Sequence, residues 1–435
     1  MKKNFKRVLS AALVIVMLFT AFPAAFAFGS KETDYTIISP YEQVDWSTWK
    51  TYKANLHAHC DASDGDPTLD ILAMTDHGVI TNGWTSERET NGIFNKFRKV
   101  YPMSEENYER ITKGLDRGGR GMTDIRGGIE CNMAVISKTH VNGYFTTYGQ
   151  GEWGIENDYR TAPVEIEKAG GYSVLNHVGD WVDSGRFPHR SHWNVYIAYF
   201  AGIFIDCPSC LGMEIVNNTD RVTRGDRELW DELLQVVIPK GRNIWAFADD
   251  DSEKLNEVGR SFEFFVLPEN NEANVKKAMK DGNFFAASKY YKTTDGVGDF
   301  DGDGNVPLVT DIKVDQKANT ITVATDPTRD CQVIEWIADG KVIATGNTID
   351  LNDYEKDLGC YIRFQMKGSG GVTYSQPFEL QYKGRIDKPV PSWALWVFKT
   401  EAGQKFMKFY HSHSFALGAL IAEKIRILIE DNIKK

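Results

Sequence analysis

Histidines and carboxylates occur together in one short stretch near the start of the chain. His57-Ala58-His59 ends one apolar run, and Thr75-Asp76-His77 ends the next. Residues i and i+2 of a strand point to the same side, so His57 and His59 can bind one ion together. Neutral imidazoles supported by carboxylates are the usual ligands of zinc, manganese or iron. The stretch therefore predicts a divalent transition-metal site.

Later apolar runs end on residues of the same kinds, which indicates how such a site would be assembled. These runs lead to Glu130, His140, His177, Asn217 and Asp249-Asp250-Asp251-Ser252-Glu253. Helical patterns at 161–169 and 227–237 separate some of the runs, and this alternation predicts parallel strands with crossovers. The parallel strands of a barrel gather their C-terminal ends on one face. Loop polarity explains Asp and Asn after a strand, but it does not explain five of the chain's nine histidines.

The order of these motifs resembles that of the polymerase and histidinol phosphatase (PHP) superfamily of metal-dependent phosphoesterases. The resemblance is carried by His57-Ala58-His59, Ser63-Asp64-Gly65, Thr75-Asp76-His77 and Gly128-Ile129-Glu130. It implies an α/β fold class, a distorted seven-stranded β/α (TIM-like) barrel, over residues 45–292. It also implies hydrolysis of a small phosphorylated substrate by a metal-bridged hydroxide.

The resemblance further implies ligands for two or three divalent ions, which would be manganese, zinc or iron. The first ion would be held by His57, His59, Glu130 and Asp251, with Asp249 as the alternative to Asp251. Glu130 would bridge to a second ion held by His140 and His177. A third ion would use Asp64, His77 and Glu253, and Glu253 replaces the family's usual histidine, which favours manganese or iron. Glu130, Asp251 and His177 would be the catalytic residues.

The chain departs from the family pattern between Gly65 and Leu69, where only Asp66-Pro67-Thr68 replaces a whole helix. This spacing predicts that the first helix is missing. The next motif is followed by an insertion at 80–124, which has a helical pattern at 105–113. Two other functions stay open. One is an amidohydrolase-like metal hydrolase, and the other is a surface binding protein whose barrel is catalytically degenerate.

The first 27 residues have the pattern of a secretory signal peptide, with a basic start, a short apolar core and Ala25-Phe26-Ala27 before the cleavage site. The sequence therefore predicts a secreted or cell-surface protein. Removing the four basic residues of this segment would lower the formal net charge from −10 to −14. Such acidity argues against a nucleic-acid partner, which binds through Lys and Arg.

The C-terminal part has the pattern of a separate β-rich region. A linker at 293–308 contains Asp299, Asp301 and Asp303, whose spacing fits either a calcium loop or a simple acidic turn. Short alternating runs at 312–314, 320–324, 333–337, 341–344, 361–365 and 378–381 predict a small immunoglobulin-like β-sandwich over 309–385 that serves as an accessory domain. Residues 386–435 predict a helical tail that packs against the body or contacts the cell surface.

Six cysteines are too few for a disulfide scaffold in a chain of this length. Cys207-Pro208-Ser209-Cys210 has the spacing of a redox motif, with a local disulfide or two free thiols as the alternatives. Cys331 and Cys360 fall in the same β-rich region, where they could pair.

Overall fold

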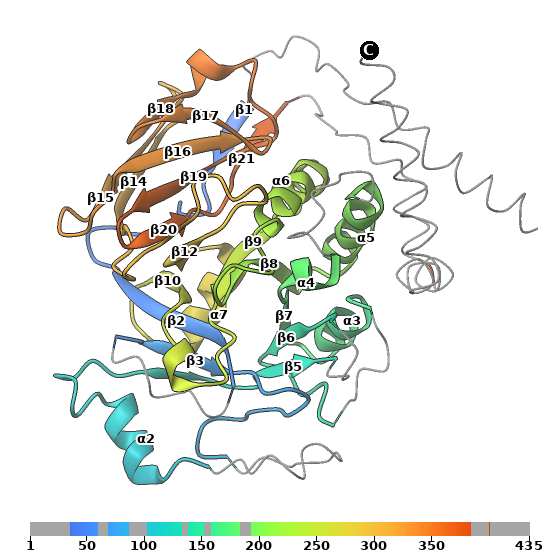
Figure 1. Cartoon of the computed structure of the whole chain (residues 1–435), viewed down its shortest axis with the longest axis vertical. Coiled ribbons are helices and arrows are strands. Elements are labelled where there is room, and N and C mark those ends of the chain that lie inside the picture. Colours follow the sequence, from blue (N-terminus) through green and yellow to red (C-terminus); the bar gives the residue numbers. More distant parts are fainter. Residues whose placement is uncertain are drawn as a thin grey trace, which may run out of the picture. The chain divides into compact units, whose positions relative to one another are not determined.

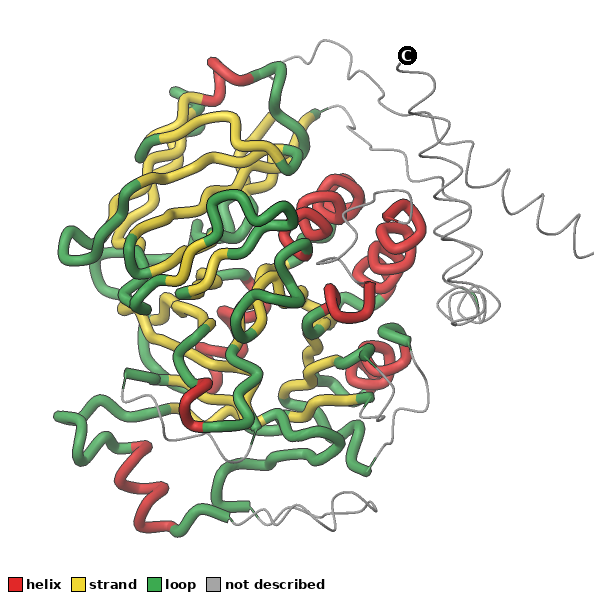
Figure 2. Tube along the Cα trace, viewed as in Figure 1, coloured by secondary structure: helices red, strands yellow, loops and turns green. Residues whose placement is uncertain are grey.

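The computed structural model describes residues 35–59, 68–86, 102–132, 138–151, 158–182, 193–383 and 400. Within them the chain is mixed α/β, and most of the trace is strand or loop (Figure 2). The signal-peptide segment, Asp64 and all of the predicted helical tail except Thr400 lie outside the described residues. In the described part, no helix is long and apolar enough to cross a membrane.

The largest sheet has eleven strands and includes β2 and β3, the strands that lead into the first two histidine motifs. Its path runs β1-β21-β19-β20-β11-β10-β2-β3-β4, with β16 and β17 branching from β19. The bounds of its N-terminal members are β1 Tyr35–Ile38, β2 Lys50–Ala58, β3 Ile71–Met74, β4 Thr123–Ile125, β10 Ser261–Leu267 and β11 Phe284–Ser288. Strands β2, β3 and β4 are parallel to one another. The segment that would test the missing helix, 60–67, lies outside the described residues.

A second sheet has five strands in the order β5-β6-β7-β8-β9 (Figure 1). Their bounds are β5 Ile129–Cys131, β6 Val141–Tyr144, β7 Tyr172–Leu175, β8 Cys210–Asn217 and β9 Trp245–Asp249. β7, β8 and β9 are parallel, as the alternation with helices predicts. The parallel prediction is wrong for β5, β6 and β7, which pair antiparallel. His140 directly precedes β6, and the predicted run that leads to it, around 135–136, lies outside the described residues.

Several of the described helices pack on the five-stranded sheet. The bounds of the helices are α2 Glu105–Thr112, α3 Thr161–Lys168, α4 Val178–Val182, α5 Trp193–Asp206, α6 Asp226–Val237 and α7 Glu272–Asp281, with short 3₁₀ turns at η1 Ile238–Lys240, η2 Leu255–Glu257 and η3 Leu351–Tyr354. The predicted helices at 105–113, 161–169 and 227–237 are confirmed to within one residue at each end. Helix α3 packs on β6 and β7, while α5 and α6 pack on β8 and on each other. Apolar side chains from these helices and strands form one buried core.

A second apolar core fills the space between the two sheets. It joins Leu56 of β2 and Ile71 of β3 to Tyr144, Phe247 and Phe265. The Tyr144 hydroxyl donates a hydrogen bond to the carbonyl of Leu56 at 2.9 Å, which ties β6 to β2. Helix α7 packs on β10; its N-cap is Asn271, whose side chain accepts from Asn274 N, and its C-cap is Gly282, with φ of +80°. A left-handed residue at this position is readily supplied by glycine.

The C-terminal strands contain all six predicted runs and two that the sequence did not indicate. Their bounds are β14 Val309–Asp315, β15 Thr320–Thr325, β16 Val333–Ala338, β17 Lys341–Thr345, β18 Thr348–Asp350, β19 Tyr361–Gly368, β20 Gly371–Tyr374 and β21 Phe378–Tyr382, of which β18 and β20 were missed. Strands β14, β15 and β18 form a three-stranded sheet. Its apolar face shares a buried core with β16, β19 and β21, and also with Phe264 of β10 and Phe285 of β11.

Backbone pairing connects the C-terminal strands to the histidine-bearing part of the chain. β20 pairs with β11, β11 with β10, and β10 with β2. At the other end of the path, β1 pairs with β21. Residues 35–38 therefore add a strand to the C-terminal region, and a continuous hydrogen-bonded sheet joins β21 to β2.

A buried ion pair also joins α6 to β19. The guanidinium of Arg363 donates to both carboxylate oxygens of Asp231, at 2.7 and 2.6 Å. The Tyr361 hydroxyl donates to the same carboxylate at 2.7 Å, and Arg363 lies 4.9 Å from the centre of the Trp230 ring. The charge of Asp231 is therefore fully paired although it is buried.

Cys331 and Cys360 do not form a disulfide with each other. Cys207 and Cys210 are two buried free thiols. Burial raises the pKa of Cys207 to about 11 and raises the pKa of Cys210 further. Reactive cysteines depend on a lowered pKa, so the pair lacks the environment of a redox motif.

Candidate metal centre

The end of β2 is tied to the loop that follows β9. Asp251 N donates to the carbonyl of His57 at 3.0 Å, and His59 N donates to the carbonyl of Ser252 at 3.0 Å. A single parallel bridge joins Ala58 to Ser252 between these two bonds. This pairing brings the Asp251 carboxylate within 3.2 Å of His57 Nε2 and 3.1 Å of His59 Nε2.

The segment after β3 is tied to β5 in the same way. A parallel bridge joins His77 to Glu130, and Gly78 N donates to the Glu130 carbonyl at 2.8 Å. The approach is close because position 128 is glycine. A Cβ atom at Gly128 would lie 2.2 Å from the carbonyl oxygen of Met74. The glycine of the Gly-x-Glu motif thus allows Glu130 to reach the histidines.

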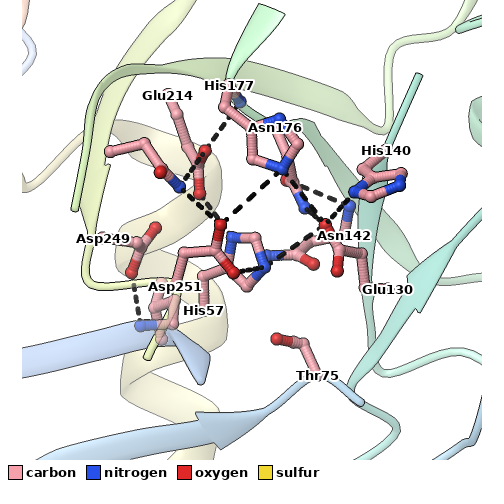
Figure 3. Close-up of polar contacts among 12 residues, drawn as sticks. His57, Thr75, Glu130, His140, Asn142, Asn176, His177, Glu214, Asp249 and Asp251 are labelled. Atoms are coloured by element: carbon pink, nitrogen blue, oxygen red, sulfur yellow. Dashed lines mark hydrogen bonds and ion pairs between the residues drawn. The ribbon is translucent and has the colours of Figure 1, made fainter. Parts of the chain in front are cut away.

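One buried carboxylate, that of Glu130, lies at the centre of the arrangement (Figure 3). All five histidines of the sequence motifs have a ring nitrogen near it. The distances to the nearer Glu130 oxygen are 3.3 Å for His57, 3.6 Å for His59, 2.7 Å for His77, 3.1 Å for His140 and 3.4 Å for His177. The fold therefore brings together four segments, at the ends of β2, β3 and β7 and before β6, around a single acidic side chain.

The ligand atoms form two groups, and within each group they all lie within 4.8 Å of one another. The first group is His57, His59, Glu130 and Asp251, and the second is His77, Glu130 and His140. Glu130 belongs to both groups, which is the position of a bridging ligand. The side chains of His77, His140 and Asp251 are 15, 18 and 26% exposed, so both groups can be reached from solvent.

The charges of this cluster shift its pKa values strongly. Burial alone would raise the pKa of Glu130, but the histidines, led by His77, hold it well below its usual value. The pKa of Asp251 is lowered in the same way, with His57 opposing the effect of burial. Burial alone would lower the pKa of His57 and His177, but the surrounding carboxylates raise the first well above its usual value and the second to about 9. The raised pKa values of His57 and His177 favour protons on these two imidazoles beside the carboxylates, and a divalent cation would replace them.

The buried polar atoms fit an ion better than they fit one another. Nε2 of His57 and Oε2 of Glu130 are buried and have no hydrogen-bond partner among the described residues. Both are lone-pair donors in the unprotonated state, and both face their neighbours without the geometry of a hydrogen bond. Imidazole and carboxylate donors that converge in this way suit zinc, manganese or iron.

A carboxylate that the sequence reading missed supports two of the ligands. Glu214 lies in the middle of the buried strand β8 and accepts a hydrogen bond from Nδ1 of His57 at 2.6 Å. Its other oxygen accepts from the backbone N–H of His177 at 2.7 Å and from the Asn217 side chain at 3.0 Å. The signal was present in the sequence, because a lone carboxylate inside an apolar run needs a buried partner.

Two side-chain amides also form hydrogen bonds with the carboxylates of the cluster. The side chain of Asn176 donates to Oε1 of Glu130 at 2.9 Å, and Asn217 lies 3.4 Å from Oδ2 of Asp251. Both amides stand at the ends of strands, where the sequence reading treated them only as strand ends. Hydrogen bonds of this kind orient metal-binding carboxylates.

The three consecutive aspartates at the end of β9 and directly after it have different surroundings. Asp249 accepts from Leu56 N at 2.6 Å, and burial beside Glu214 raises its pKa to about 7. Asp250 accepts from three backbone N–H groups, at 259–261, and from the Asn55 side chain. Only Asp251 of the three faces His57 and His59, and it does so from a backbone with φ of +47°.

Two residues predicted for a third ion are separate from the cluster or undescribed. Glu253 is exposed and belongs to neither group, and its backbone N–H is bonded to Glu257. Asp64 lies outside the described residues. His77, the third member of that predicted site, instead shares the second group with Glu130 and His140.

The predicted calcium loop follows β12 (Tyr290–Tyr291) and includes β13 (Phe300–Asp301). Asp299 accepts from Thr293, Asp301 pairs with Lys292, and Asp303 accepts from Asn305 N. The three carboxylates are exposed and form no ligand group among the described residues. Calcium binding at this loop stays a prediction.

Comparison with known proteins gave distant structural likenesses and no sequence match. No family model matches the chain, and no curated protein matches it. A two-domain protein from Bacteroides vulgatus, described as containing a predicted PHP-like metal-dependent phosphoesterase, is 14% identical, with 82% of this chain and 92% of that chain covered and a TM-score of 0.36. A lesion-specific endonuclease from Pyrococcus furiosus is 12% identical, with 53% and 56% covered and a TM-score of 0.30. At such distances, function has to be inferred from the metal-ligand cluster itself.

Proposed function

We propose that the protein is an exported, metal-dependent phosphoesterase of the PHP type that hydrolyses a small phosphate ester. The observation that carries the proposal is the Glu130 carboxylate, which is buried and lies within 3.6 Å of a ring nitrogen of each of five histidines. A carboxylate shared by two groups of ligands sets the spacing of two ions. Two-metal sites of this kind are used for displacement at phosphorus.

The strands that hold the ligands form a closed ring in this proposal. Strands β2 and β3 pair with each other, and β5 to β9 pair in order. The bridge between Ala58 and Ser252 supports closure at one seam, and the bridge between His77 and Glu130 supports it at the other. The ring has the seven strands of the distorted barrel that the PHP resemblance implies, with two antiparallel steps at β5-β6-β7.

The chain's own residues have separate tasks in the reaction. Two bound divalent cations would supply an activated water and neutralise the charge of the phosphate oxygens. Glu130 fixes the distance between the two groups of ligands, and Asp251 holds the first group against His57 and His59. His77 and His140 lie on the partly exposed side, where a substrate would enter. No nucleic-acid partner is part of the proposal, and contact with the cell surface would be made through the C-terminal region.

The test is turnover by the mature chain, residues 28–435, with p-nitrophenyl phosphate and bis-p-nitrophenyl phosphate after reconstitution with manganese or zinc. Metal-dependent turnover that Glu130→Gln abolishes would support the proposal. The control is Glu106→Gln, because Glu106 is an exposed residue of α2. Two bound ions without turnover would favour the degenerate binding protein, and turnover of amides alone would favour the amidohydrolase-like enzyme.

A further inference from the structure

The carboxylate of Glu214 contacts His57, which belongs to the first ligand group, and His177, which was predicted to bind the second ion but belongs to neither group. Oε1 accepts from Nδ1 of His57 on β2, at 2.6 Å. Oε2 accepts from the backbone N–H of His177, at 2.7 Å, just beyond β7. Glu214 itself lies on β8 and is fully buried, and it contacts neither Glu130 nor Asp251 through a hydrogen bond that the described residues show.

The contact with His57 decides which ring nitrogen carries the proton. Because Glu214 accepts at Nδ1, the neutral imidazole has its proton there, and the lone pair of Nε2 is free. Nε2 is the atom that faces the cluster, 3.3 Å from Glu130 and 3.2 Å from Asp251. Carboxylates commonly orient metal-binding histidines in this way.

The contact with His177 holds a strained turn. His177 has φ of +27°, a conformation that residues other than glycine rarely adopt. Its N–H would be buried without a partner if Glu214 were absent. Asn217 completes the arrangement by donating to the same oxygen, so Oε2 has two donors and Oε1 has one.

We propose that Glu214 is a positioning residue that fixes the tautomer of His57 and the backbone of His177 together, so that one carboxylate prepares His57 for metal and holds His177 beside Glu130. This inference rests on the proposed metal centre. It predicts a specific defect in Glu214→Gln. The glutamine oxygen satisfies the two donors at the Oε2 position, and the NH₂ group then faces Nδ1 of His57. Nδ1 must accept, its proton moves to Nε2, and the lone pair that would bind metal is lost.

The experiment compares the full chain with Glu214→Gln and with Glu263→Gln, using zinc alone as the probe. Glu263 is the matched control because it is a buried glutamate of β10 that contacts Ala248 N and lies beside Asp249. We expect Glu214→Gln to bind one of its two zinc ions about 10–100-fold more weakly, the usual effect of losing such a partner. The control, Glu263→Gln, should bind both zinc ions as tightly as the unmutated chain does. Unchanged zinc binding in Glu214→Gln would overturn the inference.

A spectroscopic readout separates tautomer control from simple support of the fold. In zinc-loaded protein with ¹⁵N-labelled histidine, we expect a slowly exchanging Nδ1–H resonance from His57, assigned by its absence in His57→Gln. Its loss in Glu214→Gln, with retention in the control, supports the inference. Its absence in the unmutated zinc-loaded protein overturns the inference, whether or not the variants fold. Less than one zinc per unmutated chain would instead overturn the metal centre, and this inference with it.

Discussion

His77 Nδ1 lies 2.7 Å from Oε2 of Glu130, and a backbone bridge joins the same two residues. The side chains and the backbones therefore meet at one point, where the large sheet approaches the five-stranded sheet. The motif Thr75-Asp76-His77 thus supplies a ligand and also a connection between the sheets. The metal centre lies at this connection, so its geometry depends on the pairing of both sheets.

Glu130→Gln is expected to remove most metal binding and activity while the fold persists. A bridging carboxylate contributes to both ions, and several kcal/mol of lost charge stabilisation correspond to about a thousandfold in rate. Elemental analysis and initial rates measure the two effects, and circular dichroism checks the fold. Retention of about half the unmutated rate would contradict the role assigned to Glu130.

His77→Gln and Glu253→Gln are expected to behave differently, although the sequence reading placed both residues at one ion. His77 belongs to the group with Glu130 and His140, whereas Glu253 is exposed and outside both groups. We expect His77→Gln to reduce manganese content and activity by at least tenfold, and Glu253→Gln to change either by less than about twofold. Titration with manganese under identical conditions compares them. A larger loss of manganese and activity in Glu253→Gln than in His77→Gln would support the predicted third-ion site.

The stability of the metal-free protein is expected to fall as the pH rises from about 6.5 to 9. The folded pKa of His177 is raised from 6.5 to about 9, because nearby carboxylates outweigh burial. A raised folded pKa gives stability that is complete below the unfolded pKa and is lost as the pH passes the folded pKa, about 3 kcal/mol for this shift. Denaturant unfolding at pH 6, 8 and 10 measures this change in the free energy of unfolding. His177→Gln should flatten the curve, and an unchanged slope would contradict the assignment.

Asp231→Asn is expected to cost about 3–5 kcal/mol of unfolding free energy, because it leaves Arg363 buried without its charge partner. The matched control is Asp311→Asn, which removes an ion pair with Lys313, whose side chain is 78% exposed. Such surface pairs contribute about 0–1 kcal/mol. Denaturant unfolding of both variants at pH 7 gives the comparison. Equal costs would show that the buried pair contributes no more than the exposed one.

The sequence predicted the helices better than it predicted strand direction. The amphipathic pattern at 161–169 and the apolar residues at 227–237 determine α3 and α6 within one residue, since helical periodicity is a local property. The direction of β5, β6 and β7 was mispredicted, because a short apolar run carries no information on the direction of its neighbours. Strand β20, Gly371–Tyr374, was missed since it is short and starts with glycine.

The histidines and Glu130 could be found in advance because their residue types are rare at the ends of apolar runs. Glu214 was not assigned a role, because its partners are the ring of His57 and the backbone of His177, which are distant in sequence. Choosing among Asp249, Asp250 and Asp251 likewise needed the pairing of β2 with the loop after β9. Residue types indicate the chemistry of the site. Only the fold decides which of several identical neighbouring residues faces the metal centre.

The hydrogen-bonded path from β21 to β2 has a consequence for how this chain can change over evolution. The C-terminal strands are not a detachable module, because cutting the chain after β11 would leave the backbone of residues 286–288 without its partner strand β20. An unpaired edge on a strand that is mostly apolar invites association with other chains. The strand two places away in the same sheet, β2, carries His57. Insertions and exchanges of sequence are therefore confined to the loops, and the ligand strand and the C-terminal region must be inherited together.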